Sequence, residues 1–149
     1  MREEDLKQRL RARNLRITPN RLEMLTAVDR YVGAIPHAKL QADLRSMDRV
    51  TLYRTINVLL EGGLIHRASA NEQESYYALC EDSCQADGHQ HQHIHFKCET
   101  CEKIYCLPLQ QNLQLNTGAF KVKNFEILAS GNCEACNLRL SQNLASEPE

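Results

Sequence analysis

The chain has 149 residues, of which 42% are apolar and 25% are charged. These are ordinary values for a globular protein, and they argue against a collagen-like, coiled-coil or fully disordered chain. No apolar run approaches the roughly 18 residues that span a bilayer, and the N-terminus lacks the apolar segment of a secretory signal. We therefore expect a soluble, cytoplasmic protein.

The charge is divided unevenly along the chain. Residues 1–67 carry 13 lysines and arginines against 8 acidic residues, a net charge of +5. Residues 68–149 carry 5 against 11, a net charge of −6. A basic first half joined to an acidic second half suggests a module that faces nucleic acid and a second module of another kind.

The first half is predicted to be helical and to end in a hairpin. Apolar spacing, a Thr-Pro helix start and a Gly-Gly helix end favour the following elements: helices over residues 3–13, 18–31, 36–44 and 50–61, then strands over residues 64–68 and 76–79. Short helices followed by a small hairpin are typical of a winged helix-turn-helix.

The second half is predicted to be a small mixed unit. The pattern predicts the following elements: strands over residues 93–97 and 104–107, a short helix over 109–115, one or two strands over 120–129 and a helix over 134–144. The fold class is therefore α/β (α+β). The predicted organisation is a winged-helix domain at 1–80, a hinge at 81–92, an α/β domain at 93–142 and a disordered tail at 143–149.

Two C-x-x-C pairs lie in the second half, Cys98 with Cys101 and Cys133 with Cys136. Seven cysteines in a chain expected in a reducing compartment are more typical of metal binding than of disulfides. Each pair places two sulfurs on one side of a turn, so two pairs can surround a structural zinc ion tetrahedrally. The alternatives are a redox-active pair or small buried thiols.

A second metal site is predicted around a histidine-rich strand. His93 and His95 alternate along it and therefore point to the same side. Cys80, at the end of the hairpin, and His66, on its other strand, can complete a four-ligand site that joins the two domains. The alternative is a solvated histidine tract that binds metals opportunistically.

The remaining metal-ligating residues have weaker assignments. Cys84, His89 and His91 lie in the polar linker and are possible secondary ligands. Cys106 is expected to be a core thiol. His37, at a helix start, is expected to be exposed or to cap the helix.

Several segments together resemble the ferric uptake regulator superfamily of bacterial metal-responsive repressors. The supporting segments are residues 15–21, 49–57, 63–65, 93–101 and 131–136. The resemblance implies an N-terminal winged helix, a C-terminal α/β domain that forms a homodimer, and binding to palindromic double-stranded DNA operators.

The resemblance also assigns DNA-contacting residues. The helix over 50–61 becomes the recognition helix, with Tyr53 and Arg54 meeting bases. Tyrosine can contact thymine methyls and arginine can bond guanine bidentately. Arg16 resembles a residue that reaches the neighbouring minor groove, and Thr51 and Arg21 are predicted phosphate contacts.

The ligand pattern is most similar to the zinc-sensing members of that family. These combine a Y-x-x-C thiolate, here at Cys80, with an H-x-H pair, and a thiolate favours zinc over iron. We predict a zinc-responsive repressor of metal-uptake genes, with one structural zinc ion and a regulatory ion that is Zn²⁺ in preference to Fe²⁺ or Mn²⁺.

Three other functions are alternatives to this one. An iron- or peroxide-responsive regulator of the same superfamily is the nearest. A zinc-storing or trafficking module would need no recognition helix. An enzyme is improbable, because catalytic zinc needs an open position and a general base, and no H-E-x-x-H motif or paired acid and base is present.

Overall fold

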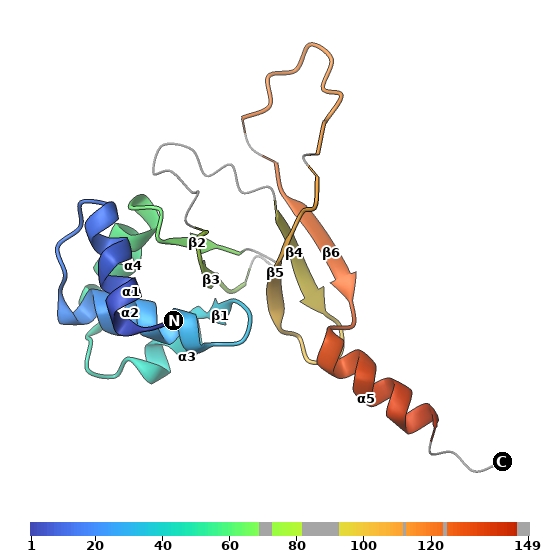
Figure 1. Ribbon diagram of the computed structural model, residues 1–149, viewed down its shortest axis with the longest axis horizontal. Coiled ribbons are helices and arrows are strands. Elements are labelled where there is room, and N and C mark those ends of the chain that lie inside the picture. Colours follow the sequence, from blue (N-terminus) through green and yellow to red (C-terminus); the bar gives the residue numbers. More distant parts are fainter. Residues whose placement is uncertain (69–72, 82–92, 112, 124, 146–149) are drawn as a thin grey trace.

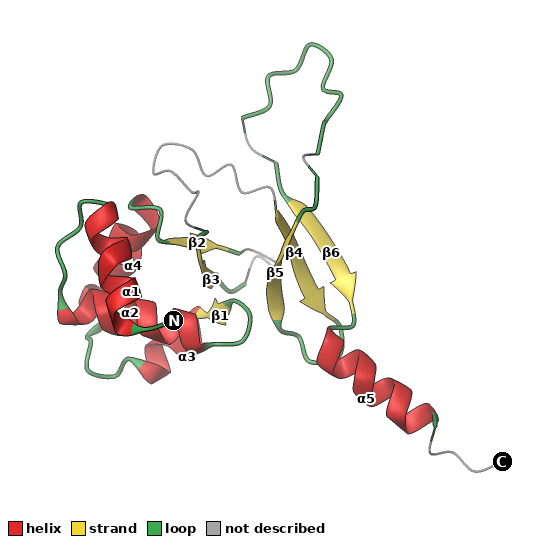
Figure 2. Cartoon of the chain, in the orientation of Figure 1, coloured by secondary structure: helices red, strands yellow, loops and turns green. Residues whose placement is uncertain are grey.

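The computed structural model describes residues 1–68, 73–81, 93–111, 113–123 and 125–145, and places four helices beside one small sheet and a fifth helix beside another (Figure 1). In chain order the elements are α1 (Glu3–Ala12), α2 (Pro19–Arg30), β1 (Ile35–Pro36), α3 (His37–Asp43), α4 (Arg49–Glu61), β2 (Ile65–Arg67), β3 (Tyr76–Leu79), β4 (His93–Cys98), β5 (Ile104–Pro108), β6 (Ile127–Gly131) and α5 (Glu134–Leu144). Figure 2 shows the separation of the two halves: the first is mainly helical, and the second is mainly strand and loop.

Local chemistry explains where the helices of the first half begin. The Thr18 hydroxyl accepts a hydrogen bond from the Arg21 amide, and Pro19 follows it at the first helical position. The Asp48 carboxylate accepts the Thr51 amide at 2.7 Å, so α4 begins one residue earlier than predicted. Side-chain oxygens at these positions satisfy amides that have no partner inside the helix. All four predicted helices of this half are present.

One apolar core joins the helices of the first half. Fully buried side chains come from all four helices: Leu6, Leu10, Met24, Leu25, Leu40, Ile56 and Leu59. They lie on one face of each helix, as the 3.6-residue period requires. The opposite face of α4 is therefore left in solvent.

The predicted hairpin is the centre of the first sheet. Strand β3 pairs antiparallel with β2 on one side and with β1 on the other. Strand β1 was not predicted, because Ile35 and Pro36 are too few to show an alternating pattern. They pair with Tyr77 and Tyr76, residues that lie about 40 positions later in the chain.

The second sheet has β4 at its centre. Strand β4 pairs antiparallel with β5 and parallel with β6, and α5 follows β6 after a short turn. These strands and α5 confirm the predicted fold class. Helix α5 continues to Leu144, two residues beyond the predicted domain boundary, and residues 146–149 of the predicted tail lie outside the described residues.

One predicted element is wrong and another is partly right. The described residues of 109–115 are not helical, and among the described residues of 120–129 the strand covers only those from Ile127 onward. Most of the apolar side chains that suggested these elements are exposed, Phe120 by 83%. A short helix gains most of its stability by burying an apolar face, and Leu113 and Leu115 remain 44% and 47% exposed.

Among the described residues, none of the helices combines the length and the apolar character needed to traverse a membrane.

Candidate metal centres and DNA-facing helix

Four cysteines gather at one end of the second sheet. Cys98 ends β4, Cys101 follows in the turn, and Cys133 and Cys136 lie at the start of α5. Their sulfurs all lie within 4.8 Å of one another, and the Cys101 and Cys133 sulfurs are 3.8 Å apart. Both C-x-x-C pairs therefore converge, as the sequence predicted, in an arrangement suited to a tetrahedral ion.

The electrostatics of this cluster favour a bound dication. The pKa of the Cys98 thiol falls to about 6, because the backbone N–H groups of Cys101 and Cys133 donate to its sulfur. Burial instead raises the pKa of Cys136 to about 12. The four sulfurs cannot all become thiolates together unless a cation compensates their charge, and zinc binds cysteine as thiolate.

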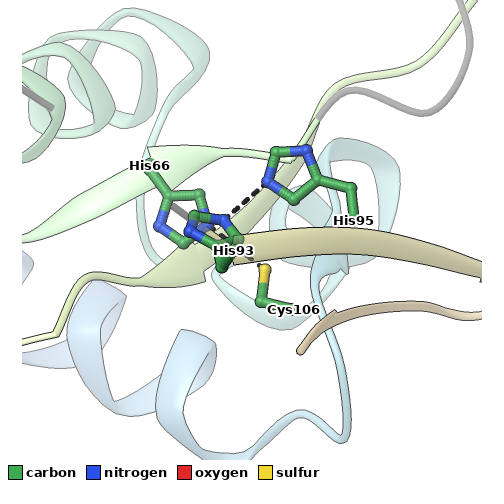
Figure 3. Close-up of side chains that lie close together, drawn as sticks. All are labelled: His66, His93, His95 and Cys106. Carbon is green, nitrogen blue, oxygen red and sulfur yellow. Dashed lines mark hydrogen bonds between the residues drawn. The ribbon is translucent and has the colours of Figure 1, made fainter. Parts of the chain in front are cut away.

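A second group of ligands lies where the two sheets approach each other. The residues whose ligand atoms lie within 4.8 Å of one another are His66, His93, His95 and Cys106 (Figure 3). His66 comes from β2 in the first sheet, and the others come from β4 and β5 in the second. The group is thus shared between the two halves of the chain.

The geometry of the histidines suits a metal better than an imidazole pair alone. The Nε2 atoms of His93 and His95 face each other at 2.7 Å. The other ring nitrogen of His95, Nδ1, is buried and has no hydrogen-bond partner among the described residues, and burial lowers the pKa of that ring. A neutral imidazole is the form that binds a metal ion.

The structure places two sulfurs on the two nitrogens of one ring. The Cys106 sulfur lies 3.2 Å from His66 Nε2, and the Cys80 sulfur lies 3.7 Å from His66 Nδ1. Cys80 is buried, its amide donates to the Leu64 carbonyl, and its own carbonyl accepts from Arg9 Nη1 at 2.9 Å. The predicted ligand Cys80 therefore contacts His66 but lies outside the group of four.

Cys106 is the residue of this group that sequence reasoning did not assign to it. Its signal was the pairing of two predicted strands: in the antiparallel register, Cys106 lies directly opposite His95. Burial raises the pKa of its thiol to about 11. The register of β4 and β5 was needed to see that Cys106 lies beside the predicted ligand His95.

Four further metal-ligating residues were singled out in the sequence, and the structure describes one of them. The predicted secondary ligands Cys84, His89 and His91 lie outside the described residues. His37 begins α3, where its amide donates to the Ser75 carbonyl and its ring lies 6.1 Å from that of Tyr77. It is therefore a residue of the first sheet's edge.

Helix α4 presents the predicted DNA-contacting residues outward. Leu52 and Ile56 are buried on its inner face, whereas Tyr53 is 63% exposed and Arg54 is exposed. An aromatic ring this exposed is available to contact a base rather than to fill a core. The Thr51 hydroxyl donates to Asp48 at the helix start.

Two further predicted DNA contacts lie at the start of α2: Arg16, the predicted minor-groove residue, precedes the helix, and Arg21, a predicted phosphate contact, lies in its first turn. Arg16 is exposed, and Arg21 donates from Nη1 to the Arg16 carbonyl at 2.6 Å. This hydrogen bond fixes the loop that carries Arg16.

Comparison with known proteins agrees with these features. A family model described as the ferric uptake regulator family matches residues 12–130. The zinc uptake regulation protein of Escherichia coli (strain K12) is 31% identical over 133 residues, a match that covers 83% of this chain and 74% of that protein.

Solved structures share the fold. A zinc uptake regulator complexed with zinc and DNA has a TM-score of 0.67 at 23% identity, and the match covers 93% of this chain and 95% of that chain. The Helicobacter pylori ferric uptake regulator has a TM-score of 0.58 at 14% identity, covering 92% and 95%. With both the family match and the relative's identity in agreement with the predicted resemblance, the chain belongs to the ferric uptake regulator family, and it is a metal-dependent DNA-binding regulator, not an enzyme.

Proposed function

We propose that this chain is a zinc-responsive repressor of metal-uptake genes that acts in the cytoplasm as a homodimer on palindromic operators. One observation carries the proposal: ligands from both sheets, His66 on one side and His93, His95 and Cys106 on the other, gather in one group. A sulfur ligand favours zinc over iron, and the relative with 31% identity is named for zinc uptake regulation.

The position of this group explains how zinc can control DNA binding. A zinc ion bound there supplies an attraction that exists only when the two halves of the chain are close. A ligand shifts a conformational equilibrium by its differential affinity for the two states, and ligands divided between β2 and β4 provide that difference. Zinc and DNA must then strengthen each other's binding by the same factor.

The proposed ligand set consists of three histidines and one sulfur. His66, His93 and His95 belong to both the predicted set and the structural group. The sulfur comes from Cys80, as the sequence predicts, or from Cys106, as the group of four favours. Cys98, Cys101, Cys133 and Cys136 are the proposed ligands of a separate, structural zinc ion.

A second copy of the chain is the proposed occupant of the exposed apolar surface in the C-terminal half. Large apolar side chains are exposed both in the segment between β5 and β6 and on α5: Leu113, Leu115, Phe120, Val122, Leu138 and Leu144. Large exposed apolar surfaces mark protein–protein interaction sites. A homodimer would also present two copies of α4, which matches a palindromic operator.

The test is a comparison of metals in one binding assay. The zinc-loaded protein selects its operator from a pool of random DNA duplexes, and the metal content of the purified protein is measured. The selected duplex is then titrated with protein at buffered free Zn²⁺, Fe²⁺ or Mn²⁺. We expect binding to saturate at the lowest free concentration with Zn²⁺. Activation by Fe²⁺ at a lower concentration, or binding that ignores metal, would contradict the proposal.

Arg54→Ala tests the assignment of α4 as the reading helix. We expect this variant to lose about 1–3 kcal/mol of binding free energy at one base position, since a bidentate arginine–guanine contact discriminates by that amount. Affinities for single-base operator variants measure it. Arg11→Ala, which removes an exposed arginine paired with Glu4 on α1, is the control. A loss that is equal for every operator variant would reassign Arg54 to a phosphate contact.

A further inference from the structure

The loop after α2 contacts strand β5 through its backbone. The Ala34 amide donates to the Ile104 carbonyl at 2.7 Å, and both residues are almost completely buried. The loop belongs to the helical first half, whereas β5 belongs to the second sheet. This hydrogen bond is therefore a direct connection between the two halves, and it involves no metal ligand.

Gly33 makes this approach sterically possible. A Cβ atom at position 33 would lie 2.4 Å from the Ile104 carbonyl oxygen, which is far inside contact distance. The obstructing atom is backbone, so no side-chain rotation can relieve the clash. The φ angle of Gly33 is +92°, a region that other residues rarely adopt. Any other residue here must move the loop away from β5.

The contact lies on β5, the strand that also carries Cys106 of the proposed regulatory group His66, His93, His95 and Cys106. Ile104 precedes Cys106 by two residues, and alternate residues of a strand face the same side. Small residues from the first half, Ala34 and Ala68, pack with Ile104 in one cluster, against which Cys106 is partly buried. Ala68 follows β2, the strand that carries His66. Seating Ile104 among these alanines thus also sets the distance between His66 and Cys106.

We propose that Gly33 is a positioning residue for zinc sensing: it lets the first half dock on β5, and this docking brings His66 within ligand distance of the second sheet. The inference rests on the proposed function. It assigns part of the coupling between zinc and DNA to a metal-free backbone contact. The loop contact then favours the arrangement in which the two halves are close, which is also the arrangement that the shared ligands favour.

The variant Gly33→Ala tests the inference, with Gly118→Ala as its matched control. Gly118 also has a positive φ angle, +55°, but a Cβ atom there would meet nothing within 4 Å. Both variants place an alanine at a positive φ angle, and only the first blocks the contact. The readout is the ratio of operator affinities with and without zinc at the regulatory site, in full-length protein whose four-cysteine site is filled.

We expect wild type and Gly118→Ala to show the same ratio, within the range of roughly 5–150-fold typical of allosteric coupling. Gly33→Ala should lower that ratio at least about fivefold while it keeps one structural zinc ion and the affinity without regulatory zinc. An unchanged ratio in Gly33→Ala would overturn the inference. If wild type itself shows no zinc dependence, the proposed function fails instead.

A measurement on the wild-type protein covers the case in which Gly33→Ala does not fold. Amide hydrogen exchange at Ala34 should slow when zinc fills the regulatory site, because the Ile104 carbonyl then holds that amide more of the time. The double variant His93→Ala/His95→Ala should abolish the slowing. Exchange at Ala34 that is independent of zinc would overturn the inference.

Discussion

Replacing Cys133 with serine is expected to remove one zinc ion per chain and to unfold the sheet formed by β4, β5 and β6. The buried centre of this half consists of Cys98, Cys133 and Cys136, with Phe96 and Tyr105 packed around them. The metal centre thus occupies the place of an apolar core. Structural zinc contributes about 10–16 kcal/mol in zinc-finger peptides, as much as or more than the ~5–15 kcal/mol stability of a typical domain.

Cys133 also links the four-cysteine cluster to helix α5. Its amide donates to the Cys98 sulfur, and its own sulfur lies 3.8 Å from that of Cys101. The same residue is the N-cap of α5, so losing the metal also frees this helix from the sheet. Native mass spectrometry measures zinc per chain, and thermal unfolding with sedimentation measures stability and dimer content.

Cys106→Ser is the matched control for this prediction. It makes the same chemical change in the same sheet, outside the four-cysteine cluster. We expect it to keep the structural zinc ion and the unfolding temperature of that half. If Cys133→Ser also retained one tightly held zinc ion and an unchanged unfolding temperature, the structural role of the cluster would be refuted.

The double variant His93→Ala/His95→Ala is expected to remain folded and to lose its zinc response. Both rings lie at the start of β4, away from Cys98 at its end, so the structural ion stays in place. Operator affinity at saturating zinc should fall to the value without regulatory zinc, a loss of roughly 5–150-fold if the coupling is of ordinary size. Fluorescence anisotropy with a labelled operator at buffered zinc measures it.

His37→Ala is the control for the histidine pair. It removes a histidine of the first sheet's edge, where its ring lies near Tyr77 and not in the metal group. We expect a wild-type zinc response. A loss in His37→Ala as large as that in the double variant would show that histidine content, and not this site, determines the response.

Cobalt absorption spectroscopy can distinguish the two sulfurs beside His66. One imidazole nitrogen binds one ion, so an ion on the Nε2 side has Cys106 as its neighbour and an ion on the Nδ1 side has Cys80. The sulfur on the opposite side then orients the ring by a hydrogen bond, a common arrangement around metal-bound histidine. With Zn²⁺ kept in the four-cysteine site and Co²⁺ at the His66 group, the thiolate-to-cobalt absorption disappears only in the variant, Cys80→Ala or Cys106→Ala, that lacks the ligand.

The sequence predicted those parts of the molecule that depend on local pattern. The Thr18 cap and the apolar period predicted the helices of the first half, and C-x-x-C spacing identified all four clustered cysteines. Cys106 was misjudged because its role depends on which residue of β4 lies opposite it. Strand β1 was missed for the same reason, since Ile35 becomes a strand residue only by pairing with Tyr77.

The prediction for the segment between β5 and β6 was inaccurate for a different reason. Its alternating apolar residues resemble a buried helix and strand, but side chains such as Phe120 and Val122 are exposed in the single chain. An apolar pattern predicts that a surface becomes buried, but it does not show whether the same chain or a second molecule buries it. In the proposed dimer, the cover comes from the partner subunit.

Strand β4 begins at His93 and ends at Cys98, so a single stretch of backbone runs from the sensing group to the thiol cluster. If the four cysteines hold a structural zinc ion as proposed, this continuity would impose an order of metal loading. The thiol cluster would have to be filled first, because it stabilises the sheet that carries His93 and His95. A regulator synthesised without zinc would then be unable to respond to it until its cysteine site had been filled.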